Sequence, residues 1–142
     1  MRRVVSGGFE LDLSARKAIR LFTPEGERDW VPGWSPTYPT GEPSETPGTV
    51  FTTDQGGIET VWLVQMINTD ESTVAYSRVT PRHHAGTVRV SCDDNPDGRC
   101  TVSVTYDMSL LPGGSPAGLD GYDHPSFDKM MRHWSEALAH KP

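Results

Sequence analysis

Two side chains that could act on a bound molecule, Tyr76 and Arg78, stand two residues apart in the segment 73–80. Turn residues bound this segment, which predicts a β-strand, and residues two apart in a strand share a face. In the following strands, the apolar residues occupy even positions. Antiparallel pairing with the same parity therefore turns Tyr76 and Arg78 toward the buried face of the sheet.

A guanidinium on that face needs a carboxylate partner or a ligand with an acidic or carbonyl group, because an unpaired buried charge is costly. Tyr76 could donate a hydrogen bond or act as a weak general acid. Arg78 and Tyr76 are therefore the catalytic candidates. In the alternative, the register slips, Arg78 is solvated on the outer face, and Tyr76 finds a backbone partner.

Aromatic and methionine side chains predict the remaining wall of a pocket for a flat hydrophobic molecule. Any one of them could equally be ordinary core, but they gather around a single predicted gap between sheet and helix. A β-bulge in any hairpin would reverse the faces upstream of it. The candidate ligand-binding residues are Trp34, Tyr38, Trp62, Val64, Met66, Tyr76, Arg78, Val88, Val90, Tyr106, Met130, Met131 and Trp134.

Two polar clusters invite a metal interpretation that their context does not support. Residues 93–98 match the opening of a calcium loop, but Val104 stands where such a loop requires glutamate, so a turn is predicted. His83 and His84 have no acidic or thiol residue spaced to complete a ligand set. We therefore expect no metal and no cofactor.

An antiparallel sheet and a long C-terminal helix must position the candidates. Residues 123–140 carry an apolar stripe at helical spacing, with Asp123 as N-cap and Pro125 in the first turn. Two short helices, beginning at Ser14 and Thr23, follow the first strand. The predicted strands are 4–13, 49–54, 60–68, 73–80, 87–92 and 100–111. Residues 33–39 are predicted as an edge strand or an extended loop and 40–48 as a mobile loop. Residues 112–121 match no assignable element.

Size, charge and apolar pattern limit the possible roles. With 142 residues, the chain predicts a single domain over 1–142. Its formal charge of −6 argues against nucleic acid and anionic membrane as partners.

The short apolar runs predict no membrane insertion, and residues 1–12 do not resemble a signal peptide, so a cytoplasmic protein is expected. Cys92 and Cys100 are then expected as free thiols, in a monomer or a homodimer.

The chain resembles the SRPBCC superfamily, also called START or Bet v 1-like. The order of strand, two short helices, meander and long helix carries the resemblance over nearly the whole chain. The stretches LFTPEGE (21–27), WVPGW (30–34), PTYP (36–39) and RVTP (78–81) are also similar to bacterial members. The resemblance implies an α+β helix-grip fold, in which a curved antiparallel sheet wraps around the C-terminal helix with an apolar cavity between them.

Three functions follow as hypotheses, because members of this superfamily bind lipids, sterols and polyketides, catalyse cyclisations or serve as co-chaperones. The favoured one is a module that binds a small hydrophobic molecule. The second is an aromatase- or cyclase-like enzyme in which Arg78 and a tyrosine polarise a carbonyl. The third is a co-chaperone, similar to the Hsp90-activator branch, that docks through its sheet. The superfamily has no invariant catalytic set to transfer.

Overall fold

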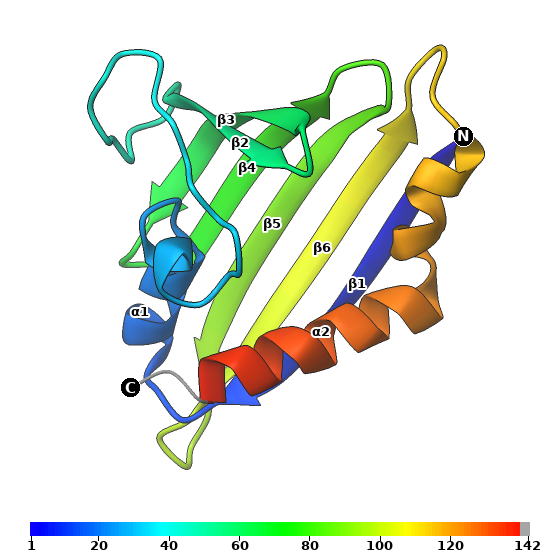
Figure 1. The fold of residues 1–142 in the computed structure, drawn as a ribbon. Coiled ribbons are helices and arrows are strands. Elements are labelled where there is room, and N and C mark those ends of the chain that lie inside the picture. Colours follow the sequence, from blue (N-terminus) through cyan, green and yellow to red (C-terminus); the bar gives the residue numbers. More distant parts are fainter. Residues whose placement is uncertain (140–142) are drawn as a thin grey trace.

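The computed structural model describes residues 1–139, and within them six strands form one antiparallel sheet in the order β1-β6-β5-β4-β3-β2. Helix α2 packs against β1 and crosses the sheet. Its C-terminal end lies toward the short helix α1 (Figure 1). The elements are β1 (Arg2–Leu11), α1 (Ala15–Ala18), η1 (Ile19–Phe22), η2 (Gly26–Asp29), β2 (Val50–Gln55), β3 (Ile58–Asn68), β4 (Thr73–Thr80), β5 (His84–Asp94), β6 (Cys100–Leu110), η3 (Pro116–Tyr122) and α2 (His124–Ala139). This is the predicted α+β helix-grip architecture.

The register of the central strands follows the predicted parity. Tyr76 lies opposite Val88, and Val88 lies opposite Tyr106, so the even-numbered residues of β4, β5 and β6 share the inner face. Arg78 lies opposite Gly86 on that face. The prediction that Arg78 turns inward is therefore correct, and the slipped register is wrong.

A β-bulge in β3 makes one predicted placement wrong. Val64 pairs with Tyr76, but Met66 pairs with Ala75, so the register shifts between these two pairs. Beyond the bulge, Ile67 lies opposite the fully buried Val74 and takes the inner position. Met66 therefore leaves the inner face, because the extra residue in one strand reverses the alternation.

Helix α2 begins where the sequence predicts. The Asp123 carboxylate accepts a hydrogen bond from the Ser126 amide at 2.7 Å, as an N-cap does. The stripe is buried at Phe127, Met131 and Leu138 and half-buried elsewhere. The prediction for the helix extends to His140, which lies outside the described residues.

The N-terminal short helices close one end of the sheet. The Ser14 side chain accepts a hydrogen bond from the Lys17 amide and caps α1. The Thr23 hydroxyl accepts one from the Gly26 amide at 3.0 Å, but η2 itself begins at Gly26 with Glu25 as its N-cap. The predicted start at Ser14 is correct, but the second helix begins at Gly26 and not directly after Thr23, and most of these turns are 3-10 rather than α-helical. These turns bury Phe22, and two backbone hydrogen bonds fix the position of Glu27.

The proline-rich segments have defined places. Thr37 exchanges two backbone hydrogen bonds with Thr52 of the edge strand β2 in an isolated bridge, so residues 33–39 form the extended loop, one of the two predicted alternatives. In the segment 112–121, Ser115 caps η3, whose Leu119 is fully buried. This helix was not predicted, and it places Tyr122 against Tyr106.

Two further features bear on the cell-biological predictions. No helix within residues 1–139 is long and apolar enough to cross a membrane. Cys92 and Cys100 are buried free thiols on neighbouring strands. Burial is the main reason why the pKa of Cys92 is raised to about 12.

Candidate functional site

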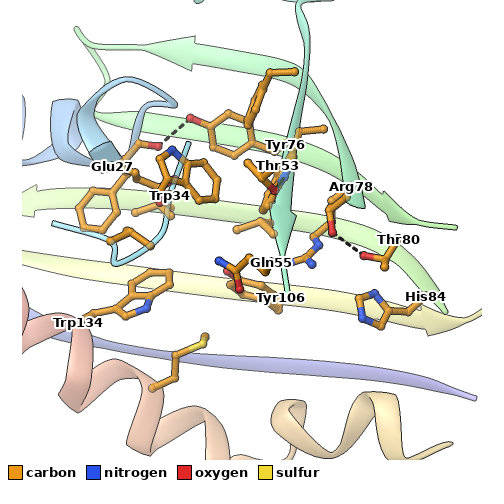
Figure 2. Close-up of a pocket in the computed structure, with 18 of the residues that line it drawn as sticks. Glu27, Trp34, Thr53, Gln55, Tyr76, Arg78, Thr80, His84, Tyr106 and Trp134 are labelled. Atoms are coloured by element: carbon orange, nitrogen blue, oxygen red, sulfur yellow. Dashed lines mark hydrogen bonds between the residues drawn. The ribbon is translucent and has the colours of Figure 1, made fainter. Parts of the chain in front are cut away.

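A cavity of about 480 Å³ lies between the sheet, η2, η3 and α2. Its volume is within the usual range of small-molecule sites, roughly 300–1,000 Å³. Figure 2 shows its side chains converging from these separate elements. The cavity is lined by Phe22, Glu27, Val31, Trp34, Phe51, Thr53, Gln55, Ile58, Thr60, Trp62, Tyr76, Arg78, Thr80, His84, Val88, Val90, Tyr106, Tyr122, Met130 and Trp134.

Most of the predicted pocket residues line this cavity. They are Trp34, Trp62, Tyr76, Arg78, Val88, Val90, Tyr106, Met130 and Trp134. Strand parity predicted the sheet residues of this set, and helical spacing predicted Met130 and Trp134. Both groups line the same cavity.

Four predicted residues do not line it. Tyr38 is buried outside the cavity wall, and its hydroxyl donates to Glu25 at 2.8 Å. Val64 is on the inner face but is covered by core, and Met66 lies beyond the bulge. Met131 packs beside Gly7 of β1 on the other side of the helix, where it borders a separate and more open hollow.

The sequence prediction missed three titratable lining residues. His84 has the predicted parity. It was missed because the strand was predicted to begin at residue 87, whereas β5 begins at His84. Tyr122 lies on the unpredicted η3. Glu27 falls in the short helix predicted to begin at Thr23, and nothing in its spacing indicated that it lines the cavity.

The aromatic wall is rigid and several of its polar atoms are already bonded. Trp62 and Phe51 stack with ring centroids 5.6 Å apart. The Trp62 indole N–H donates to the Thr53 hydroxyl at 3.0 Å, and the Trp34 indole N–H donates to the Pro24 carbonyl at 2.8 Å. Flat apolar faces, rather than these donors, are what the wall offers to a bound molecule.

Tyr76 is also committed to the protein. Its hydroxyl donates to the Phe22 carbonyl at 2.7 Å, and burial raises its pKa. A phenol whose proton is held by a backbone carbonyl and whose pKa is raised is a poor general acid. The structure therefore disfavours Tyr76 as a catalytic residue and gives it the alternative role, a buried tyrosine with a backbone partner.

Arg78 is the cation of the cavity. Its guanidinium carbon lies 4.7 Å from the centroid of the Trp62 ring, a cation–π contact. Its Nε atom is buried and has no hydrogen-bond partner within residues 1–139. Gly86, directly opposite, leaves no side chain between β4 and β5 at this point. The guanidinium is held in place by stacking and remains available for a hydrogen-bonding partner.

Glu27 is the carboxyl of the cavity. Desolvation raises its pKa well above the usual range, and the Arg78 charge counteracts only part of that rise. The two side chains form no ion pair in the described part of the chain. The charge of Arg78 therefore acts on the pKa of Glu27 across the cavity, although no ion pair joins the two side chains in the described residues.

Two further groups surround Arg78. Burial raises the pKa of Tyr106, and interaction with Arg78 opposes that rise. The pKa of His84 is lowered, first by burial and then by the charge of Arg78, which favours the neutral ring. His84 Nδ1 is buried without a hydrogen-bond partner among residues 1–139. No group of three His, Cys, Asp or Glu residues in the described range could hold a metal ion.

Solved structures share this fold at low sequence identity. A hypothetical protein from Helicobacter pylori has a TM-score of 0.74 and 13% identity, over 98% of this chain and 88% of its own. Ara h 8.0201 has a TM-score of 0.69 and 13% identity, over 97% and 95%. Norcoclaurine synthase from Thalictrum flavum has a TM-score of 0.66 and 9% identity, over 99% and 88%. No protein-family model and no curated protein matches the sequence. These likenesses confirm the predicted Bet v 1-like helix-grip fold.

Proposed function

We propose that the cavity binds a small, mostly apolar molecule and directs one acidic or carbonyl group of it toward Arg78. The single observation behind this proposal is the Arg78 Nε atom, buried without a partner among aromatic rings. A cation in such a place is costly unless something bonds to it. An oxygen of the ligand would supply that bond.

The expected energetics assign different roles to Arg78 and to the aromatic wall. A hydrogen bond to a charged group contributes roughly 1.5–3 kcal/mol, which is enough to orient a ligand. Apolar burial would supply most of the remaining affinity, at about 25 cal/mol per Å² before ordering costs. Trp34, Trp62 and Trp134 provide the apolar faces for it.

A structure of the same fold supports the ligand class. Norcoclaurine synthase from Thalictrum flavum has been solved in complex with dopamine and hydroxybenzaldehyde, both small aromatic molecules. At 12% identity this likeness concerns the fold alone. The rings around the present cavity are the feature of this chain that suits a similar class of molecule.

A binding screen tests the proposal. Thermal shift and native mass spectrometry would be applied to aromatic polyketides, fatty acids and flavonoids, with the wild-type protein and Arg78→Met. We expect hits to bind the wild type about tenfold or more tightly than the variant. Equal binding to both proteins would remove Arg78 from the site.

Failure of every apolar compound would disfavour the binding function altogether. The co-chaperone alternative would then gain weight. Its docking surface would be the outer face of the sheet, where Leu63 and Val79 are 39% and 40% exposed.

Proton transfer in the same cavity is the second candidate function, and Glu27 is the observation that favours it. A carboxyl with a raised pKa beside a cation is a common arrangement for general acid–base catalysis. With a ketone bound, Glu27 would remove an α-proton, the C–H electron pair would form the enolate, and Arg78 would stabilise the enolate oxygen. The proton then returns to carbon.

Deuterium exchange into 2-tetralone, followed by NMR in heavy water, measures this activity. We expect exchange above the buffer rate with the wild type and with Glu42→Gln, an exposed control glutamate. Glu27→Gln should abolish the enhancement. No enhancement by the wild type, with 2-tetralone shown to bind, would exclude this activity on simple ketones.

A further inference from the structure

The polar atoms that line the cavity fall into two sets according to whether the protein satisfies them. Thr60 and Thr80 bond to each other at 2.8 Å, which satisfies one hydrogen bond of each hydroxyl. The Trp62 indole, the Trp34 indole and the Tyr76 hydroxyl each donate to a protein oxygen. These groups need nothing from a ligand.

The unsatisfied set includes two atoms of a group on the sheet, which we call the sheet cluster: Arg78, His84 and Tyr106. Its members come from the neighbouring strands β4, β5 and β6, and the charge of Arg78 acts on both others. Arg78 Nε and His84 Nδ1 are both buried without partners within the described chain. This cluster lacks a hydrogen-bond acceptor for Arg78 and, with the neutral ring of His84, can use either a donor or an acceptor there.

Glu27 is an unsatisfied group that enters the cavity from η2 instead of the sheet. Its backbone is fixed at both ends, because its amide donates to the Thr23 carbonyl at 3.0 Å and its own carbonyl accepts from the Val31 amide at 2.9 Å. Its carboxyl makes no hydrogen bond or ion pair with any residue that the structure describes. Figure 2 shows Glu27 and Arg78 reaching into the cavity from different elements.

A cation and a carboxyl in one cavity would normally pair, and here they do not. A molecule with a single polar group could satisfy Arg78 or Glu27 but would leave the other without a partner. An unsatisfied group in a closed site weakens binding, because its desolvation is not compensated.

We propose that the ligand carries two separated polar groups on an apolar body: a carboxylate or similar acceptor for the sheet cluster, and a hydroxyl for Glu27. The inference rests on the binding function proposed above and names the class of ligand. The raised pKa of Glu27 suits a hydroxyl, because a protonated carboxyl can both donate and accept. Hydroxylated aromatic carboxylic acids have this pattern.

Four naphthalene probes separate the contributions. 6-Hydroxy-2-naphthoic acid carries its groups at opposite ends of the ring system, and 3-hydroxy-2-naphthoic acid carries the same groups side by side. 2-Naphthoic acid and 2-naphthol each keep one group. Dissociation constants would be measured by calorimetry with wild type, Glu27→Leu, Arg78→Met and Glu42→Gln, the last being an exposed glutamate on the 40–48 loop.

We expect the wild type to bind the 6-hydroxy acid about tenfold more tightly than 2-naphthoic acid, since one added hydrogen bond is worth about that factor. Glu27→Leu should erase this preference while retaining 2-naphthoic acid, and Glu42→Gln should keep it. Arg78→Met should weaken both acids and leave 2-naphthol nearly unchanged.

The outcomes distinguish this inference from the proposed function. If 2-naphthoic acid binds in an Arg78-dependent way but the 6-hydroxyl adds nothing, the cavity takes a ligand with one polar group and the inference is overturned. The same holds if the 3-hydroxy isomer binds as well as the 6-hydroxy isomer, or if the preference survives Glu27→Leu. Failure of all four probes to bind the wild type would overturn both proposals.

Discussion

The two sides of α2 show how one apolar stripe can build both a solid core and a cavity. On the β1 side, Gly7 has no side chain, and the Phe127 ring lies so close that a Cβ at this position would come within 3.2 Å of it. On the other side, Met130 and Trp134 face Trp62, Arg78 and the rest of the cavity wall. The helix packs tightly where the sheet offers glycine, and stands off where the sheet offers large rings.

The solid side should carry the largest stability effect. Phe127 is fully buried, so Phe127→Ala should destabilise the domain by about 3–5 kcal/mol, as large-to-small core changes do. Chemical denaturation measures the loss. A loss below about 1 kcal/mol, typical of surface sites, would contradict this packing.

The cavity side should tolerate truncation better. Trp134 belongs to the apolar stripe of residues 123–140, whose spacing predicts a buried indole, but the side chain is only half-buried. It contacts Trp30 and also Phe22, which lines the cavity. Trp134→Ala should therefore cost about 1–2 kcal/mol, less than Phe127→Ala, because part of the ring already borders empty space. Equal losses of unfolding free energy in the two variants would contradict the difference in packing between the two sides of α2.

Removal of the cavity cation should have a small effect of the opposite sign. Arg78→Met replaces a guanidinium whose buried Nε has no hydrogen-bond partner within residues 1–139 with an apolar side chain of similar length. We expect the ligand-free protein to gain up to about 1 kcal/mol, since replacing buried charge with apolar groups is often neutral or stabilising. Thermal unfolding without ligand checks the sign, with the exposed Arg82→Met as control. A clear loss would show that Arg78 already has a structural partner.

The pH dependence of stability should reveal Glu27. Its pKa is raised in the folded protein, so the folded state holds this proton more tightly than the unfolded state does. The resulting stabilisation is complete below the ordinary carboxyl pKa and is lost as pH rises through the folded pKa. Glu27→Gln, which cannot ionise, should therefore gain stability relative to the wild type as pH rises from 4 toward neutrality. A constant difference between the two proteins would contradict the raised pKa.

Local patterns predicted the positions of most strands and of α2 because the signals are short-range. The N-cap at Asp123 and the apolar spacing from Phe127 to Leu138 depend only on residues within the same helix. Strand parity placed Arg78 correctly because no bulge interrupts β4, β5 or β6 in the observed pairings. The prediction failed at Met66 because a β-bulge shifts the register there, and no feature of the local sequence indicates this bulge.

The sequence by itself determined which side chains share a face of a strand or helix, since periodicity of two and of about 3.6 residues fixes this. The resemblance supplied the helix-grip arrangement, and the sequence left the inward Arg78 as one of two alternatives. Only the tertiary structure decided which of those side chains meet a cavity and which meet solid core, as with Trp134 and Met131. It also brought Glu27 into the same cavity as Arg78, although 51 positions separate them in the chain. Contacts between distant elements depend on how those elements dock, and docking is set by the shape of the whole core.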